Sequence, residues 1–316
     1  MSTQTTKNSL WSSLAPLSWA GLGAYLMLVA LVYVLHPVSP DLVYSGFQML
    51  IMSWQNPAYD YGHGWLVIPI CIWLLVHSCR KINKDKLQGS MHGLWLVFLG
   101  SFLFILSFHA HQWRITNGAL PLLLLGGIWY FWGKHCAVRC AFPLCFMWFC
   151  IPVPIFQHAT SSMQIMATNA AAWGTSLLGI QTIQEGTSLT LASGEGLPFS
   201  IAGGCSGMRS LMALAMISVA WGYLADKLQL WKRVLLMVSA IPLAIVANAI
   251  RVTSIFICAE YIDPAFASKT WHDWSGLLFF FPASLLGITL IHGLLAGEIP
   301  FMKRRRIVIR NNNTIQ

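Results

Sequence analysis

The feature that most constrains this chain is a series of long apolar stretches separated by short polar segments. A helix needs about 20 mostly apolar residues to cross a bilayer, and several stretches approach or exceed that length. Only 9% of the residues are charged, against about 25% in soluble domains, which excludes an ordinary soluble enzyme. The sequence therefore predicts an all-α polytopic integral membrane protein. We expect about eight transmembrane helices, near residues 17–36, 64–79, 90–110, 118–133, 140–157, 205–224, 232–262 and 274–296.

The basic residues lie in short clusters between the apolar stretches, as they do when they set membrane orientation. With the N-terminus in the cytoplasm, the inside segments carry Lys7, Arg80, Lys81, Lys84, Lys86, Lys134, Arg139, Lys227, Lys232, Arg233, Lys303, Arg304, Arg305, Arg306 and Arg310. The outside segments carry only Arg114, Arg209, Arg251 and Lys269. The net charge of +9 is therefore a topology signal and does not indicate nucleic acid. Both termini are expected in the cytoplasm.

Three segments are expected to lie on the outer surface. The apolar run at residues 47–54 is too short to span. Residues 158–181 carry Met163, Met166, Ala170, Trp173 and Leu177 at helical spacing and no charge, which predicts an amphipathic helix in the interface. Residues 182–200 alternate apolar and polar residues between turn signals and predict a short hairpin of two or three strands.

We expect a single membrane-embedded domain over residues 1–316. Its parts are a cytoplasmic tail (1–16), the first five spans (17–157), the outer amphipathic helix and hairpin (158–204), three spans that carry the site (205–296) and a basic cytoplasmic tail (297–316).

Three residues that can carry chemistry reach the outer end of their spans in this topology. Cys205 lies in Gly-Gly-Cys-Ser-Gly-Met-Arg-Ser at a helix start, where the helix dipole and Arg209 favour thiolate. Arg251 lies in an apolar run and needs a group to bind, because an intramembrane guanidinium is costly. His272 opens the last span. A thiolate, an imidazole and a guanidinium together support acyl transfer.

Each residue also has an ordinary structural interpretation. A membrane cysteine most often packs, a buried arginine is more often structural or part of an ion pathway, and a histidine at the outer rim is commonly interfacial. A transporter or flippase for envelope glycan or lipid, with Arg251 in the translocation path, is the main alternative function. A structural component of an envelope assembly is a further one.

Other candidates are weaker. His63 begins the second span on the outer side and either helps to bind substrate or caps the helix. Cys258 lies two turns after Arg251 and either approaches the site or packs. The remaining cysteines of the fifth span have no metal-site spacing, so packing is favoured and no metal or cofactor is expected. These are Cys136, Cys140, Cys145 and Cys150, with His135 beside them.

Several blocks together resemble the exosortase/archaeosortase family of membrane transpeptidases. They are Cys-Ser-Gly-Met-Arg-Ser at residues 205–210, Pro-Leu-Ala-Ile-Val-Ala-Asn-Ala-Ile-Arg-Val at 242–252, His272, and Tyr-Gly-His-Gly at 61–64. Archaeal members have an arginine where this chain has His272, so the bacterial exosortase branch is the better match. Many relatives carry an acidic residue shortly before the cysteine, whereas Ala-Gly-Gly precedes it here.

The resemblance implies a bacterial inner-membrane enzyme, associated with exopolysaccharide, whose active site faces the periplasm. Its substrates are exported proteins with a C-terminal signal that consists of a Pro-Glu-Pro type motif, a transmembrane helix and a basic tail. Cys205 would be the nucleophile, Arg251 and His272 would complete the catalytic site, and the acceptor is unspecified. Arg209, His63, Asn248 and Ser206 would bind substrate or support the site. Membrane lipids are further expected partners, and nucleic acid is not.

Overall fold

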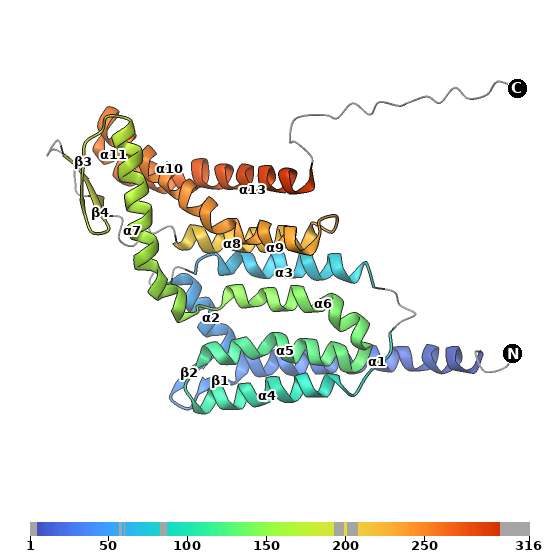
Figure 1. Cartoon of the computed structure of the whole chain (residues 1–316). Coiled ribbons are helices and arrows are strands. Elements are labelled where there is room, and N and C mark those ends of the chain that lie inside the picture. The colour runs from blue at the N-terminus through green and yellow to red at the C-terminus, as the bar shows by residue number, and fades with distance from the viewer. Residues whose placement is uncertain are drawn as a thin grey trace, which may run out of the picture. The chain divides into compact units, whose positions relative to one another are not determined.

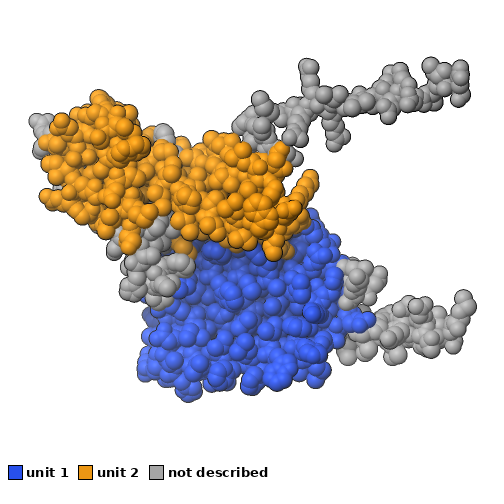
Figure 2. Space-filling model, viewed as in Figure 1, with its two compact units in different colours: residues 1–159 blue, residues 160–316 orange. Residues whose placement is uncertain are grey.

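The structure is a computed structural model that describes residues 5–56, 59, 61–82, 87–192, 199–200 and 208–297. Within these residues it is mostly helical, with two small sheets (Figure 1). The chain divides into two compact units, residues 1–159 and 160–316, which Figure 2 colours separately.

Helix α5 is the centre of the first unit, where it contacts α1, α4 and α6, while α3 packs on α6. The elements of this unit are α1 (Thr5–Leu35), β1 (Pro37–Ser39), β2 (Leu42–Ser45), α2 (Gly46–Gln55), α3 (Gly64–Cys79), α4 (Gly93–His109), α5 (Trp113–Trp132), α6 (Lys134–Phe146) and the 3₁₀ helix η3 (Met147–Cys150). The outer faces of α1, α3 and α4 expose large apolar side chains, such as Met27, Ile72 and Trp95. Apolar faces of this kind are typical of helices in contact with lipid.

Buried polar side chains join α1, α2 and α5 at one end of this unit. The Tyr33 hydroxyl donates to the Thr116 carbonyl at 2.7 Å. The amide of Asn117 donates to the carbonyls of Gly46 and Trp113, each at 3.1 Å. Because a buried polar group without a partner is costly, these bonds hold α2 on α5. The apolar run expected on the surface is therefore a short helix fixed to a longer one.

The fifth span differs from its expected bounds of 140–157. Helix α6 begins at Lys134, directly after Gly133, whose φ of 86° lets the chain turn within one residue. The helical structure ends with η3 at Cys150, and Ile151, which precedes a proline, is extended. Residues 134–139, expected as a loop, are therefore helical, and residues 154–157 belong to the next helix, α7 (Pro154–Leu177).

Helix α10 is the centre of the second unit. The first half of α10 packs with α8, α9 and α13 around Ala244, Ala247 and Phe280. Its later part packs with α7 and the strands around Val252 and Phe256. Besides α7, the elements are β3 (Thr182–Glu185), β4 (Ser188–Leu191), β5 (Phe199–Ser200), α8 (Met208–Leu224), α9 (Leu230–Val238), α10 (Ala240–Tyr261), α11 (Pro264–Phe266), the π-helical turns η4 (Ala267–Trp271) and η5 (Gly276–Phe280), α12 (His272–Ser275) and α13 (Phe281–Ala296).

The segment between the two sets of expected spans consists of α7 and a small antiparallel sheet in the order β3, β4, β5. The strands fall within residues 182–200, where a hairpin is expected. The buried face of α7 holds the small residues Ala167, Ala171 and Thr175. Trp173 and Leu177, on the expected apolar stripe, are 68% and 65% exposed, as suits a helix at a membrane surface. The side chain of Met163 lies outside the described residues.

Among the described residues, two helical stretches are long and apolar enough to cross a membrane, Trp113–Trp132 and Leu230–Tyr261. Shorter apolar helices are Trp19–Leu35, Gly64–Cys79, Gly93–His109, Met212–Leu224 and Phe281–Ala296. The expected number of eight spans and the single-domain organisation therefore stay predictions.

Candidate functional site

Arg251 lies within α10 with only 8% of its surface exposed. Its Nε donates to the Ser275 hydroxyl, and its Nη2 donates to the backbone carbonyl of His272, both at 3.1 Å. The Ser275 hydroxyl donates to the same carbonyl at 3.1 Å. Two of the five N–H donors of the guanidinium are thus used by groups in the described part of the chain. The structure thus brings Arg251 into contact with α12 (His272–Ser275).

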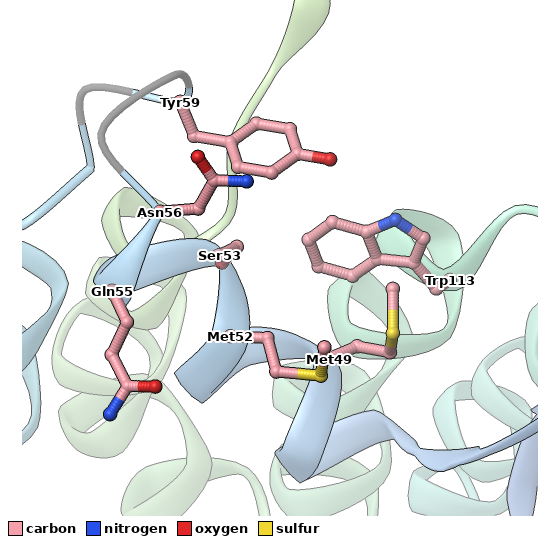
Figure 3. A pocket seen from close by; sticks show the side chains of 7 residues that line it. All are labelled: Met49, Met52, Ser53, Gln55, Asn56, Tyr59 and Trp113. Carbon is pink, nitrogen blue, oxygen red and sulfur yellow. The ribbon is translucent and has the colours of Figure 1, made fainter.

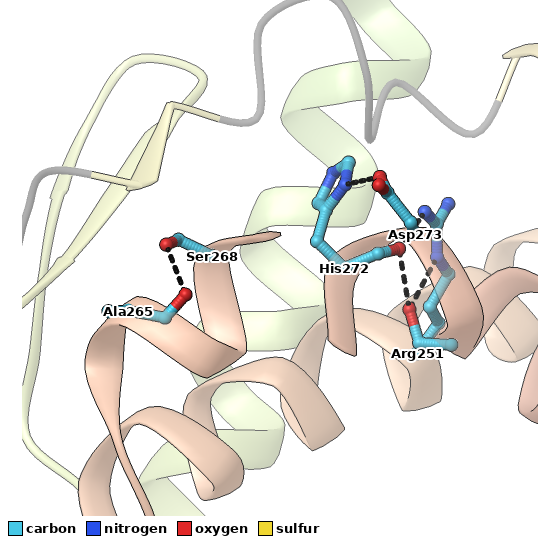
Figure 4. Close-up of polar contacts among 6 residues, drawn as sticks. Arg251, Ala265, Ser268, His272 and Asp273 are labelled. Carbon is cyan, nitrogen blue, oxygen red and sulfur yellow. Dashed lines mark hydrogen bonds and ion pairs between the residues drawn. The ribbon is translucent and has the colours of Figure 1, made fainter. Parts of the chain in front are cut away.

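His272 lies on a short helical turn between two π-helical turns. Helix α12 covers only His272–Ser275, with η4 before it and η5 after it. Isolated π-helical turns change the direction of side chains and occur frequently at functional sites. Figure 4 shows the His272 ring turned toward the Asp273 carboxylate, while Nη2 of Arg251 binds the backbone carbonyl of His272. The local backbone thus presents the His272 carbonyl to Arg251 and turns the His272 ring toward Asp273.

A second set of hydrogen bonds holds the backbone of Arg251. The Ser254 hydroxyl donates to the Arg251 carbonyl at 2.6 Å, one helical turn away. The indole of Trp271 donates to the same hydroxyl at 3.3 Å. α10 and η4 are therefore joined directly beside the residue that carries the buried charge.

The His272 ring has an acidic neighbour that the sequence analysis did not select. Its Nδ1 lies 3.2 Å from Oδ1 of Asp273, with 27% of the His272 side chain and 76% of the Asp273 side chain exposed. A carboxylate can only accept, so Nδ1 carries the hydrogen in this contact. In the sequence, the only sign of this contact was that Asp273 directly follows His272. Ser275 was missed as well, because its contact with Arg251 depends on how α10 packs against α12.

The expected nucleophile is not among the described residues. Cys205 and Ser206 lie outside the described residues, and so does the side chain of Arg209, although α8 includes its backbone. Asn248 is buried in α10, one turn before Arg251. The meeting of Cys205 with Arg251 and His272 therefore stays a prediction.

The Tyr-Gly-His-Gly element at residues 61–64 belongs to the first unit and binds the backbone of η3 and of the residues just after it. His63 is the N-cap residue of α3, but its ring makes no cap hydrogen bond, and its Nε2 lies 3.2 Å from the Phe149 carbonyl. The Tyr61 hydroxyl accepts from the Val153 N–H at 3.2 Å, and burial raises the pKa of this phenol, which keeps it neutral.

Gly64 completes this element by allowing a tryptophan to approach. A Cβ at this position would lie 2.3 Å from Nε1 of Trp54, which is far inside contact distance. The same Nε1 donates to the Cys150 carbonyl at 2.8 Å. The element therefore joins the end of α2 and the start of α3 to residues 149–153.

Several of the other cysteines pack in the core. Cys258 is 4% exposed within the apolar cluster around α10, which favours the packing interpretation. Cys136 and Cys140 are buried in the cluster between α5 and α6. Among the described residues, no three His, Cys, Asp or Glu side chains are grouped so that they could hold a metal ion.

These observations define the class of the protein: a helical membrane protein with a buried arginine that is held against a histidine-bearing turn. The family described as transmembrane exosortase matches residues 53–289, three quarters of the chain. The chain therefore belongs to the exosortase family of membrane proteins. No curated protein and no solved structure matches it.

Proposed function

We propose that this protein is a membrane cysteine protease or transpeptidase that cleaves the C-terminal sorting signals of exported proteins. Membership of the exosortase family suggests this class of activity. The signal would combine a Pro-Glu-Pro type motif, one transmembrane helix and a basic tail. The Cys205 thiol would be the nucleophile, with His272 and Arg251 as its catalytic partners.

The proposed reaction proceeds through a thioester. The thiolate of Cys205 attacks the carbonyl carbon of the scissile peptide bond, the C–N bond breaks, and the departing amine takes a proton from His272. An acceptor, which is water, an amine or a lipid, then attacks the thioester and gives its proton to His272. The C–S bond breaks and the thiolate is restored.

The observation that carries this proposal is the buried guanidinium of Arg251. A peptide carbonyl develops negative charge on its oxygen as sulfur adds to it, and fixed N–H donors stabilise that charge strongly where water is excluded. Arg251 is 8% exposed and oriented by Ser275 and the His272 carbonyl, while three of its donors are not used within the described part of the chain. It thus has both the charge and the spare donors that the step needs.

The contact between His272 and Asp273 supports the proton-transfer role. A hydrogen on Nδ1 makes Nε2 the basic nitrogen of the neutral ring. The carboxylate also favours the protonated ring that must form when the thiol ionises. In this proposal Asn248, Arg209, Ser206 and His63 support the site or bind substrate.

The topology is part of the same proposal. With both termini in the cytoplasm of a bacterial inner membrane, His272 and the outer half of α10 face the periplasm. A substrate helix with a cytoplasmic basic tail would present its short motif on that side. Exported proteins and membrane lipids are then the partners.

The test is to coexpress an exported reporter that carries a candidate C-terminal signal with the wild-type chain, with Cys205→Ser and with Cys79→Ser. Cys79 is an exposed thiol at the end of α3, so its replacement is a matched control. We expect the shortened reporter with the wild type and with Cys79→Ser, and only the full-length reporter with Cys205→Ser at equal membrane levels.

Two results would contradict the proposal. If the Cys205→Ser variant shortens the reporter as well as the wild type does, Cys205 is excluded as the nucleophile. That result would favour a transporter or flippase with Arg251 in its translocation path. Shortening that continues after alkylation of all thiols would exclude a thioester mechanism of any kind. Hydroxylamine trapping of a reporter intermediate on the wild-type chain would provide direct support.

A further inference from the structure

Gly276 directly follows Ser275 and begins the π-helical turn η5, where it lies against the guanidinium of Arg251. Its backbone has a φ of −61° and a ψ of −46°, the ordinary right-handed helical conformation that any residue adopts. Alanine also favours a helix over glycine. Neither the local conformation nor helix propensity therefore explains a glycine at this position, and the reason lies in the space that a side chain would fill.

The space beside Gly276 is bounded by Arg251. Apart from its own turn and its chain neighbours, the first described atoms that a Cβ on Gly276 would meet all belong to the guanidinium. The Cβ would lie 3.7 Å from Cζ, 3.8 Å from Nε and 3.9 Å from Nη2. These are ordinary van der Waals distances, so alanine would fit without strain. Packing thus does not require the glycine either, in contrast to Gly64, where a Cβ would overlap Trp54.

The three distances place this position over the flat face of the Arg251 guanidinium. A point in the plane, beside the edge that holds Nε and Nη2, would lie nearer to these nitrogens than to Cζ, whereas Cζ is the nearest atom here. The N–H groups point outward in the plane, so they are not directed at this position. Because Gly276 has no side chain, a space the size of a methyl group is left on the face. The glycine is only half-buried, so the described residues do not seal this part of the turn.

Arg114, in the first unit, shows how the flat face of a guanidinium is used elsewhere in the chain. Its guanidinium carbon is 5.1 Å from the centre of the Trp113 ring and 5.9 Å from that of Tyr59, and both rings are drawn in Figure 3. Arginine stacks on planar π systems because its guanidinium is flat and weakly hydrated. Among the described residues, no aromatic ring takes this place on Arg251. Its face is therefore a stacking surface that the described part of the chain does not use.

We propose that Gly276 keeps this face of Arg251 open for a planar peptide group of the substrate, the one next to the scissile bond. This role rests on the proposed function. The scissile carbonyl oxygen binds at the edge of the guanidinium, where donors remain after the bonds to Ser275 and the His272 carbonyl. The neighbouring peptide group, which is flat, lies on the face above Gly276. Gly276 is thus a specificity-determining residue, because it sets how closely the substrate backbone approaches Arg251.

The test compares the wild-type chain with Gly276→Ala and Gly276→Val, each purified in detergent, and measures KM and kcat for the reporter. The matched control is Gly23→Ala, since Gly23 is a helical glycine whose Cβ would meet nothing within 4 Å. Cys205→Ser is assayed beside them to show that shortening of the reporter depends on the thiol. The melting temperature of every variant is measured in the same detergent.

We expect Gly276→Ala to raise KM by about tenfold and to leave kcat within about twofold of the wild type, because a stacked peptide group is bound equally in the ground state and the transition state. Gly276→Val covers more of the guanidinium face and should raise KM by roughly a hundredfold. Gly23→Ala should have the wild-type KM. The melting temperatures of Gly276→Ala and Gly23→Ala should equal or exceed that of the wild type.

An unchanged KM in Gly276→Ala, while the wild type shortens the reporter, would overturn the inference and leave the proposed function intact. A fall in kcat at unchanged KM would also overturn it, because Gly276 would then act only in the transition state. A clear fall in the melting temperature of Gly276→Ala would show that the glycine serves the fold, which again contradicts the inference. If the wild type does not shorten the reporter, or if Cys205→Ser shortens it as well, the proposed function itself fails, and the role of Gly276 fails with it.

Discussion

Arg251 binds the backbone of His272 and not its ring: Nη2 of the arginine donates to the His272 carbonyl oxygen across 3.1 Å. The ring of His272 points instead to Asp273. Removal of the imidazole therefore leaves the anchor of the arginine in place. The structural and the proposed catalytic contributions of this pair can be separated by mutation.

His272→Ala should abolish reporter processing while the protein remains folded. Proton transfer by a positioned side chain contributes about 10²- to 10⁴-fold to rate, and this variant loses it, whereas the carbonyl that binds Arg251 remains. The processing rate and the melting temperature in detergent are measured together. A fall in melting temperature as large as that of Arg251→Ala would show that the ring itself stabilises the fold, contrary to this prediction.

Ser275→Ala should slow processing by about tenfold, because it removes the acceptor for Nε of Arg251 and lets the guanidinium move. Ser268→Ala is the matched control, since Ser268 is half-buried in the neighbouring turn η4 and its hydroxyl donates to the Ala265 carbonyl one turn earlier (Figure 4). Ser275→Thr keeps the hydroxyl and should restore most of the rate. If Ser275→Thr is as slow as Ser275→Ala, the hydroxyl is not what positions the arginine.

The helices were largely predictable, because apolar stretches of the required length leave few alternatives in a membrane. The predicted helix bounds were wrong where a single residue changes the direction of the backbone. Gly133 turns the chain at once, so α6 starts six residues before its expected beginning. The strands β1 and β2 had no signal in the sequence analysis because they are only 3 and 4 residues long.

The site was predictable only in part. Topology alone predicted that Arg251 and His272 lie toward the same face of the membrane, and in the structure Arg251 binds the His272 carbonyl. The predicted topology could not show that Arg251 binds a backbone carbonyl, nor that Ser275 takes part, because both contacts depend on the π-helical turns around α12. Asp273 was visible as a neighbour of His272, but a sequence does not show which way a side chain points.

Asp273→Asn should reduce processing by several-fold and not abolish it. The amide cannot stabilise a protonated His272 ring as a carboxylate does, but the pair is exposed enough for water to replace part of the effect. Asp41→Asn is a matched control, since Asp41 is 77% exposed and pairs with His111 at 3.0 Å in the first unit. Equal loss in both variants would mean that surface charge in general, and not the Asp273 contact, sets the rate.

Gly64→Ala should destabilise the protein by about 2 kcal/mol, even though it adds one methyl group outside the proposed catalytic residues. The new Cβ would lie 2.3 Å from Nε1 of Trp54, so the indole must move and its hydrogen bond to the Cys150 carbonyl must break. Gly23→Ala is the control, because a Cβ at that helical position meets nothing within 4 Å and alanine favours a helix. Thermal unfolding in detergent should show a clear loss of stability for Gly64→Ala and no loss for Gly23→Ala.

Trp54→Phe, which removes the indole N–H but keeps an aromatic ring, should recover part of the stability when combined with Gly64→Ala. If the double variant is no more stable than Gly64→Ala alone, crowding of Trp54 is not the reason for this glycine.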